Sequence, residues 1–318
     1  MTTPATPMLS MMLVTFSAED PGGWDDMIRR AEEADRAGID RLALSDHVVF
    51  GERLEEYGDP ARGGTTGGRQ PTGPDGHWLE PLTVATYLAA RTTHVRFFTG
   101  ILLAALRRPV VLAKTTATLD VLSGGRLDLG VGVGWQREEY EAAGLDYTRR
   151  GHLLDHTLGV VQTLWRETAA DFADDHLAFT AIHQMPKPRS PGGVPIWVSG
   201  TVNDRAMARL ARFGQGWIPW GADADDLVES IPRMRAAVTA AGGDPDPIEV
   251  LGALSVVKGD DGAVDLDATM AAVPALRDAG VTDFRLGFRI RPDTPDAEAR
   301  MAALVNAFRT TVGRPTEG

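Results

Sequence analysis

At 318 residues the chain could hold one large or two ordinary domains. Its 44 acidic and 32 basic side chains give a net charge of −12, which argues against general affinity for nucleic acid or an anionic membrane, because both need a basic face. The absence of cysteine excludes disulfides and thiolate metal sites, and it suits a reducing cytosol.

The N-terminal stretch MTTPATPMLSMMLVTF lacks the basic region and the small-residue cleavage pattern of a signal peptide. No apolar run reaches the roughly 18 residues of a membrane-spanning helix. We therefore expect a cytoplasmic protein with neither a membrane nor a nucleic acid as its partner.

Strands and helices alternate along the chain. The apolar run 8–16 predicts a strand, 25–38 predicts a helix that ends at Gly38, and 39–45 predicts a second strand. The same alternation continues to the C-terminus. The further predicted strands are 95–102, 126–134, 194–200, 216–221, 247–257 and 283–288, and the further predicted helices are 79–93, 109–124, 151–167, 203–214, 225–242, 265–280 and 296–313.

About eight strands and eight helices in alternation, with no linker between them, favour one closed barrel over two open sheets. The sequence thus predicts a single α/β domain over 1–318, a (β/α)8 TIM barrel with insertion loops at the C-terminal face of the strands. Two segments exceed the minimal barrel. We interpret 50–78 as an insertion loop or lid and 168–193 as a second insertion.

Asp46 and His47 follow the second predicted strand directly, at the rim where active sites of barrels lie. A histidine there can reach a bound ligand and move a proton near neutral pH, and an adjacent carboxylate would modulate it. The alternative is a loop-start pair that hydrogen-bonds nearby backbone. Position at the reactive rim favours the catalytic interpretation.

Three glycines alternate along the fourth predicted strand and its exit, at Gly130, Gly132 and Gly134. Every second position lacks a side chain, so that a flat ligand could approach the backbone. The spacing is not the G-x-G-x-x-G dinucleotide fingerprint. Alternatively, the glycines make room for bulky neighbours inside the barrel.

Ser199, Gly200 and Thr201 lie between the fifth predicted strand and a helix. Free backbone N–H groups and the positive end of a helix dipole at this point suit a phosphate. An ordinary Ser/Thr/Asn helix cap is the alternative.

Other candidate chemistries have little support. His152 and His156 have the i, i+4 spacing of metal ligands, but no third ligand is evident, and we expect no metal site. No G-x-S-x-G elbow supports nucleophilic acyl transfer. Aromatic residues near predicted strand ends could wall a pocket for a flat ligand or simply pack the rim; these are Trp78, Trp135, Trp197, Trp217 and Trp220.

Three stretches together resemble the luciferase-like monooxygenase superfamily of flavin and deazaflavin oxidoreductases. They are SDH after the second strand, TGILLAALRRPVVLAKTTATLDVLSGGRLDLGVGVGWQREEYEAAG in the middle, and VPIWVSGT before a helix. The resemblance covers nearly the whole chain, and the superfamily fold is a (β/α)8 barrel. The SDH spelling is similar to the branch that uses the deazaflavin coenzyme F420.

The resemblance implies a set of site residues. Asp46 and His47 would lie against the deazaflavin ring, with His47 near the carbon that carries the hydride. A cis peptide between Gly100 and Ile101 would support the ring from behind. The implied cofactor contacts are Asp46, Thr99, Gly100, Ile101, Val133 and Gly134, with Ser199, Gly200 and Thr201 at the phosphate. Arg107 and Arg108 would assist the acidic tail of the coenzyme.

One position departs from the family. Sugar-phosphate dehydrogenases of the superfamily carry a glutamate after the G-x-G motif, and this chain has Trp135 there. The change argues against sugar-phosphate oxidation. Trp135 and Trp78 instead suggest a bulkier, less polar substrate pocket.

The resemblance therefore implies an oxidoreductase that transfers a hydride between F420 and a small, fairly apolar organic substrate. One alternative is an FMN-dependent two-component monooxygenase that receives reduced flavin from a separate reductase. The other is a non-catalytic flavin- or deazaflavin-binding protein. Apolar outer helices and the habit of the family suggest a homodimer.

Overall fold

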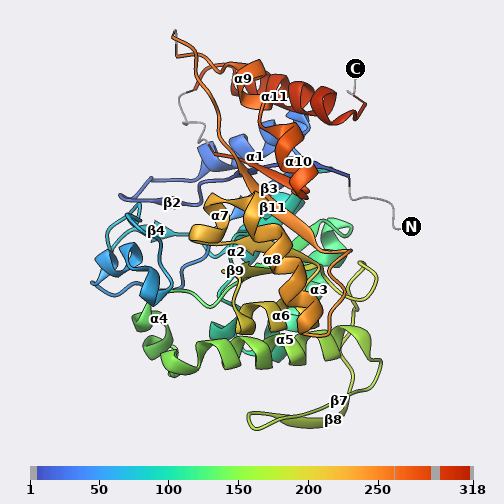
Figure 1. Ribbon diagram of the computed structural model, residues 1–318. Coiled ribbons are helices and arrows are strands. Elements are labelled where there is room, and N and C mark those ends of the chain that lie inside the picture. The colour runs from blue at the N-terminus through green and yellow to red at the C-terminus, as the bar shows by residue number, and fades with distance from the viewer. Residues whose placement is uncertain (1–5, 261, 288–293, 316–318) are drawn as a thin grey trace.

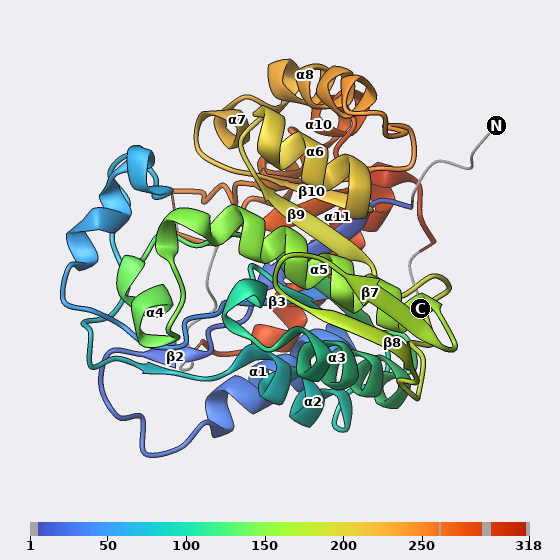
Figure 2. The same cartoon turned by 90° about the horizontal axis from the view of Figure 1, so that it is seen from below.

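The computed structural model describes residues 6–260, 262–287 and 294–315. Its centre is a closed barrel of parallel strands, surrounded by helices (Figures 1 and 2). The first strand, β1, pairs with both β3 and β12, which closes the barrel. In spatial order the barrel strands are β1 (Met8–Met12), β12 (Asp283–Leu286), β11 (Glu249–Leu254), β10 (Gly216–Pro219), β9 (Ile196–Gly200), β6 (Leu127–Val131), β5 (Arg96–Thr99) and β3 (Arg41–Leu44).

The eight barrel strands coincide with the eight strands predicted from the sequence, and the predicted barrel is confirmed. Position 288, the last of the predicted eighth strand, lies outside the described residues. The helices that pack around the barrel are α1 (Asp25–Ala37), α2 (Pro81–Ala89), α3 (Pro109–Ser123), α5 (Arg150–Arg166), α6 (Asp204–Phe213), α8 (Leu227–Ala240), α10 (Val273–Ala279) and α11 (Ala297–Val312).

The helix predicted over 265–280 is instead two short helices, α9 (Leu266–Met270) and α10. Pro274 favours a new start at this point, because proline lacks the N–H that a continuing helix needs and fits best in a first turn, where it lies in α10. Another short helix, α7 (Ala222–Asp225), follows β10. None of the helices in the described ranges is long and apolar enough to span a bilayer.

Alternation of side chains along each strand divides them between two environments. In β3, Leu42 and Leu44 join the large apolar core between strands and helices. Ala43 faces the barrel interior, where it packs with Phe98 and Trp197. Both faces of the strand are thus buried, as expected in a parallel barrel.

A buried ion cluster fills one level of the barrel interior. The guanidinium of Arg41 donates from Nε to Asp128 at 2.8 Å and from Nη1 to Asp283 at 2.6 Å. Arg96 also donates to both oxygens of Asp128, each at 2.7 Å. Burial raises the pKa of Asp128, but the two arginines outweigh burial and lower it. The cluster therefore stays charged at neutral pH.

The insertion 50–78 lies at the C-terminal face of the strands, as expected. It contains two 3-10 turns, η1 (Leu54–Gly58) and η2 (Pro60–Arg62), and it ends in the short strand β4 (His77–Trp78). This strand pairs antiparallel with β2 (Phe16–Ser17), which follows β1.

The second insertion, 168–193, differs from the expectation of a loop at the C-terminal face. It forms a hairpin of β7 (Ala170–Ala173) and β8 (Ala178–Ile182), and both views place it away from β2 and β4. Its Phe172 lies against Gly159 of α5, and Lys187 donates to carbonyls at the end of that helix. The reason is that this insertion follows a helix rather than a strand.

The buried ion cluster generates a prediction about stability. Replacement Asp128→Ala should lower the free energy of unfolding by about 3–5 kcal/mol, because it removes the carboxylate that Arg41 and Arg96 share and leaves Asp283 as the remaining close partner of Arg41. Chemical denaturation measures the change. The control Asp225→Ala removes an exposed carboxylate and should stay within about 0.5 kcal/mol of the parent. Equal stability of both variants would contradict the proposed importance of the cluster.

Candidate active site

Asp46 and His47 leave the end of β3 in opposite directions. Asp46 is buried, and its carboxylate accepts from the backbone N–H of Leu103 at 2.8 Å. Arg107 adds two bonds to it, Nη1 to Oδ2 at 2.7 Å and Nη2 to Oδ1 at 3.1 Å. We expected Asp46 to support His47, but its oxygens instead tie the β5 exit to the β3 exit.

The carboxylate beside His47 belongs to Glu139, in the short helix α4 (Arg137–Ala142). Its Oε2 lies 3.3 Å from Nδ1 of His47, and its Oε1 accepts from the backbone N–H of Val48 at 2.9 Å. Glu139 is buried, while the His47 side chain keeps 11% of its surface exposed. With the proton of His47 on Nδ1, directed at this carboxylate, Nε2 is left as the proton acceptor.

Aromatic rings surround His47. The ring centroid of Phe50 lies 4.4 Å from that of His47, that of Trp78 4.9 Å and that of Trp135 6.2 Å. Trp78 also stacks on Phe16 at 4.2 Å. The imidazole is therefore held in a largely apolar wall, which limits its contact with water.

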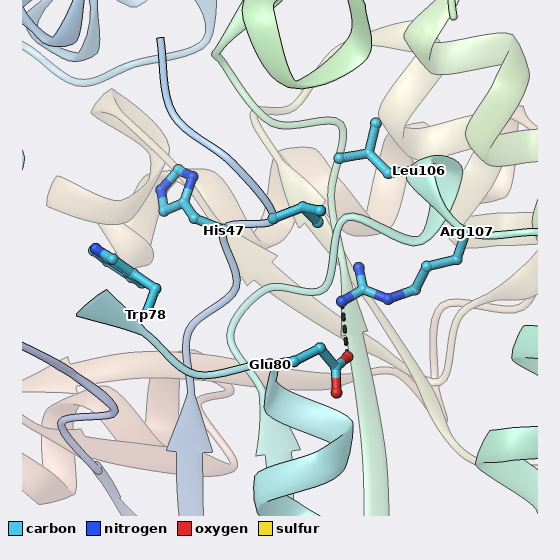
Figure 3. A pocket seen from close by; sticks show the side chains of 6 residues that line it. His47, Trp78, Glu80, Leu106 and Arg107 are labelled. Atoms are coloured by element: carbon cyan, nitrogen blue, oxygen red, sulfur yellow. Dashed lines mark hydrogen bonds and ion pairs between the residues drawn. The ribbon is translucent and has the colours of Figure 1, made fainter. Parts of the chain in front are cut away.

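A pocket opens beside this wall, and we name it the rim pocket (Figure 3). Its volume is about 240 Å³. In Figure 3, His47 and Trp78 lie on one side and Leu106 and Arg107 on the other, with Glu80 below. The residues that line it are His47, Val48, Trp78, Glu80, Leu106 and Arg107. Trp78 lines this pocket, whereas Trp135 is buried and is not part of the lining. A role for either residue in binding substrate stays a prediction.

The inward-facing residues at the C-terminal ends of the strands line a region that we call the barrel mouth. Leu251 of β11 packs inside the barrel. Ala253 is two residues further along the same strand, so it faces the same side, and it is exposed. Gly100, Gly132 and Ser199 are also small residues at inward positions. Small side chains at this level leave space for a ligand above the packed interior.

The alternating glycines serve the packing of two strand exits. A Cβ on Gly130 would meet the carbonyl oxygen of Thr99 at 2.0 Å, and one on Gly132 would meet Ile101 at 2.5 Å. Gly134 has φ +68°, a conformation that favours glycine. These close approaches favour the second interpretation, in which the glycines make room for neighbouring atoms. Val133 packs partly against the core, and its carbonyl accepts from Tyr140 at 2.6 Å.

The peptide bond between Gly100 and Ile101 is cis, as the resemblance implies. Thr99 is fully buried, and its hydroxyl donates to the carbonyl of Gly130 at 2.8 Å, so its side chain does not face the mouth. Gly100 lies beside Arg285 of β12, whose Nη1 would be 3.3 Å from an added Cβ. Burial lowers the pKa of Arg285 to about 10, so this cation remains charged at neutral pH.

Several buried polar atoms near the strand ends have no hydrogen-bond partner in the described part of the chain. They follow or end three of the barrel strands: Oγ of Ser45, Nε1 of Trp135, both amide atoms of Gln136 and Nη2 of Arg285. A buried polar group without a partner costs roughly 1–3 kcal/mol. Such a concentration is typical of a site that a polar ligand or water completes.

Ser199, Gly200 and Thr201 lie at the end of β9, as predicted. Helix α6 is capped by Asn203, whose Oδ1 accepts from the N–H of Ala206 at 3.0 Å. The preceding N–H, of Val202, donates to Asp223 at 2.7 Å. Asn203 thus forms the ordinary helix cap that was the alternative to a phosphate site. A phosphate contact at 199–201 stays a prediction.

The insertion 50–78 crosses the barrel mouth. It leaves β3, and its Gly63 and Gly64 carbonyls accept from Nε1 of Trp220 at 3.2 and 3.1 Å. Trp220 follows β10, which is four strands from β3 in either direction around the barrel. Just before these glycines, the carbonyl of Arg62 accepts from the hydroxyl of Tyr147 at 3.0 Å. The segment is therefore attached on opposite sides of the opening.

The remaining candidates have structural partners. His156 pairs with Asp174 of the hairpin at 2.5 Å, and no cluster able to hold a metal ion occurs among the described residues. Arg107 is engaged by Asp46 and Glu80, which argues against a role in binding an acidic tail. Arg108 is exposed at the start of α3.

Sequence reasoning missed Glu139, although the signal was present. The pair Glu138-Glu139 follows the glycine-rich strand within a few residues, and strand exits of a barrel meet at one face. It also missed Phe16, which meets Trp78 through the pairing of β2 with β4. That pairing joins segments about sixty residues apart, and no local sequence pattern predicts it.

The model of the luciferase-like monooxygenase family matches residues 8–317. An uncharacterised protein of Mycobacterium tuberculosis (strain ATCC 25618 / H37Rv) is 29% identical over 290 residues, which are 86% of this chain and 90% of that protein. Pyrimidine monooxygenase RutA of Cronobacter sakazakii is 30% identical over 176 residues, which are 53% of this chain and 51% of RutA.

Among solved structures, an F420-dependent secondary alcohol dehydrogenase in complex with an F420-acetone adduct superposes with a TM-score of 0.72. The superposition covers 96% of this chain and 99% of that one, and at 18% identity it shows the fold alone. Because the family model spans nearly the whole length, the chain belongs to the luciferase-like monooxygenase family.

Proposed function

We propose that the protein is a coenzyme F420-dependent oxidoreductase that transfers a hydride between the deazaflavin and a small, fairly apolar organic molecule. One observation carries the proposal: His47, anchored by a buried carboxylate, lines the rim pocket just after the end of β3. A group able to move a proton thus lies in the wall of a pocket at the face where active sites of barrels lie.

The residues of the barrel mouth fit a flavin or deazaflavin ring. The pyrimidine edge of either ring presents N–H donors and carbonyl acceptors, and the unpartnered atoms of Ser45, Gln136 and Arg285 offer complementary groups. Small inward residues such as Gly100 and Ala253 leave room for a flat ring. Ser199, Gly200 and Thr201 would hold the phosphate.

The cofactor supplies the redox chemistry when bound, since a deazaflavin accepts or returns a hydride, whereas a reduced flavin can also react with oxygen. When an alcohol is oxidised to a carbonyl compound, its carbon loses a hydride and its oxygen loses a proton. Nε2 of His47 would take that proton and return it in the reverse reaction. Glu139 would orient the imidazole and stabilise its cationic form.

An FMN-dependent two-component monooxygenase is the second candidate. The observation in its favour is the similarity to Pyrimidine monooxygenase RutA over half of the chain. This function would need a separate reductase, and it would use the same mouth and the same histidine. A cofactor-binding protein without catalysis is less well supported, because it gives no reason for the anchored His47.

We also propose a homodimer, with a second copy on the outer face of α2 and α3. Val111 and Leu122 of α3 are 63% and 69% exposed, and eleven residues separate them, which places them on one face of the helix. Tyr87 of the adjacent α2 is 51% exposed. Large apolar side chains on neighbouring helices are typical of an interface.

The cofactor can be assigned by titration. Purified protein should bind F420 about tenfold or more tightly than FMN, as measured by the change in cofactor absorbance or fluorescence. Tight binding of FMN with no binding of F420 would overturn the assignment in favour of the second candidate.

His47→Gln should lower turnover by about 10²–10⁴-fold, because it removes the group that exchanges the proton. Glu139→Gln keeps the hydrogen bond to the N–H of Val48 but removes the charge, so it should lower kcat less and leave KM nearly unchanged. Steady-state kinetics and cofactor titration of each variant provide the measurements. Full turnover by His47→Gln would remove its proposed role.

Leu122→Asp should convert the proposed dimer into a monomer, because it buries a charge in an apolar interface. Light scattering during size-exclusion chromatography measures the mass. Val228→Asp, at an exposed site on α8, is the matched control and should leave the dimer intact. A monomeric parent protein would refute the proposal.

A further inference from the structure

The rim pocket contains an arginine that cannot easily bind an anion. Nη1 of Arg107 donates to Asp46 at 2.7 Å and to the carbonyl of Leu103 at 3.3 Å. Its Nη2 donates to Asp46 at 3.1 Å and to Glu80 at 2.8 Å. Four of the five N–H groups of a guanidinium are thus directed at protein oxygens. No pair of N–H groups remains to hold a ligand carboxylate or phosphate in the two-pronged geometry that such anions favour.

Carboxylates outnumber cations around the pocket. One guanidinium faces two carboxylates, Asp46 and Glu80, and the carboxylate of Glu139 lies behind His47. Burial opposes the charge of Arg107, but Asp46 and Glu80 outweigh burial and raise its pKa. Burial also raises the pKa of Glu80. Hydrogen bonds from the backbone N–H of Thr83 and from the guanidinium of Arg107 have a larger effect, and the pKa of Glu80 is lowered. Arg107 and Glu80 are therefore both charged at neutral pH, and three carboxylates against one guanidinium leave an excess of acidic groups around the pocket.

The rest of the lining is apolar and the space is small. Val48, Leu106 and the indole of Trp78 provide most of the walls (Figure 3). A volume of about 240 Å³ lies below the roughly 300–1,000 Å³ of sites for drug-sized ligands. The pocket therefore suits a compact molecule with an apolar body.

We propose that the rim pocket receives the substrate and selects compact uncharged or cationic molecules over anions of the same size. The identification of the bound molecule as the substrate rests on the proposed function. The selection by charge rests only on the ion pairs of Arg107 and on the carboxylates around it. Glu80 is then a residue that determines specificity, because it adds negative charge and occupies Nη2 of Arg107.

Three probes of similar size test the charge selection: benzyl alcohol, benzylamine and benzoate. Isothermal titration calorimetry of the full chain at neutral pH measures each affinity, first without cofactor and then with the cofactor that binds in the titration above. Benzoate should bind on the order of tenfold or more weakly than benzyl alcohol, because it meets an excess of like charge. Benzylamine should bind at least as tightly as the alcohol.

Glu80→Gln provides the decisive variant. The amide oxygen can still accept from the N–H of Thr83 and so preserve the cap of α2, while one negative charge is lost. Affinity for benzoate should rise about tenfold, affinity for benzylamine should fall, and affinity for benzyl alcohol should stay unchanged. Glu229→Gln removes the same charge from an exposed position on α8 and should alter none of the three affinities.

Four results would overturn the inference. They are equal or tighter binding of benzoate by the parent protein, no binding of any probe, a Glu80→Gln variant that shifts all three affinities alike, and loss of benzyl alcohol binding once cofactor is present. The last result would assign the pocket to the cofactor. The protein could also bind neither F420 nor FMN and still bind benzoate more weakly than the other two probes. That result would refute the proposed redox function but not the charge selection.

Discussion

Side-chain alternation in a closed barrel is the constraint on which the site depends. Each strand sends every second residue inward, and the inward residues of all strands meet in layers. Lower in this barrel the layers are filled, by the ion cluster of Arg41 and by a group of aromatic and aliphatic side chains that includes Phe98. At the strand ends the inward residues become small, and a space remains that the helices outside cannot fill.

The same alternation gives Asp46 and His47 separate tasks. Neighbours in an extended chain point to opposite sides, so one of the pair joins the structure of the rim while the other lines the rim pocket. Asp46 binds the N–H of Leu103 and thereby fixes the chain that follows β5, where the cis peptide lies. His47 must take its carboxylate partner from elsewhere, and α4 supplies it in Glu139.

The sequence predicts the barrel well because the barrel is a local pattern repeated eight times. Strand, helix and turn are each readable within a window of residues. The main departures are the helix interrupted near Pro274 and the predicted strand 8–16, of which 8–12 enters the barrel while 16–17 pairs with β4. The site is less readable, because its contacts join distant segments. Glu139 meets His47 across 92 positions, and the sequence signals only its place after a strand exit, not its partner. Trp78 meets Phe16 through a two-residue strand pair that has no local signature.

Attachment of the insertion 50–78 on opposite sides of the mouth has a chemical consequence. A segment held only at its two ends could swing away, but this one is also bonded to Trp220, across the barrel from its origin. A segment fixed on opposite sides of the opening limits the access of water to whatever binds beneath it, which would strengthen electrostatic interactions there. His47 and Arg107 both line the rim pocket, so the proposed charge selection and the proposed proton exchange would share one part of the rim.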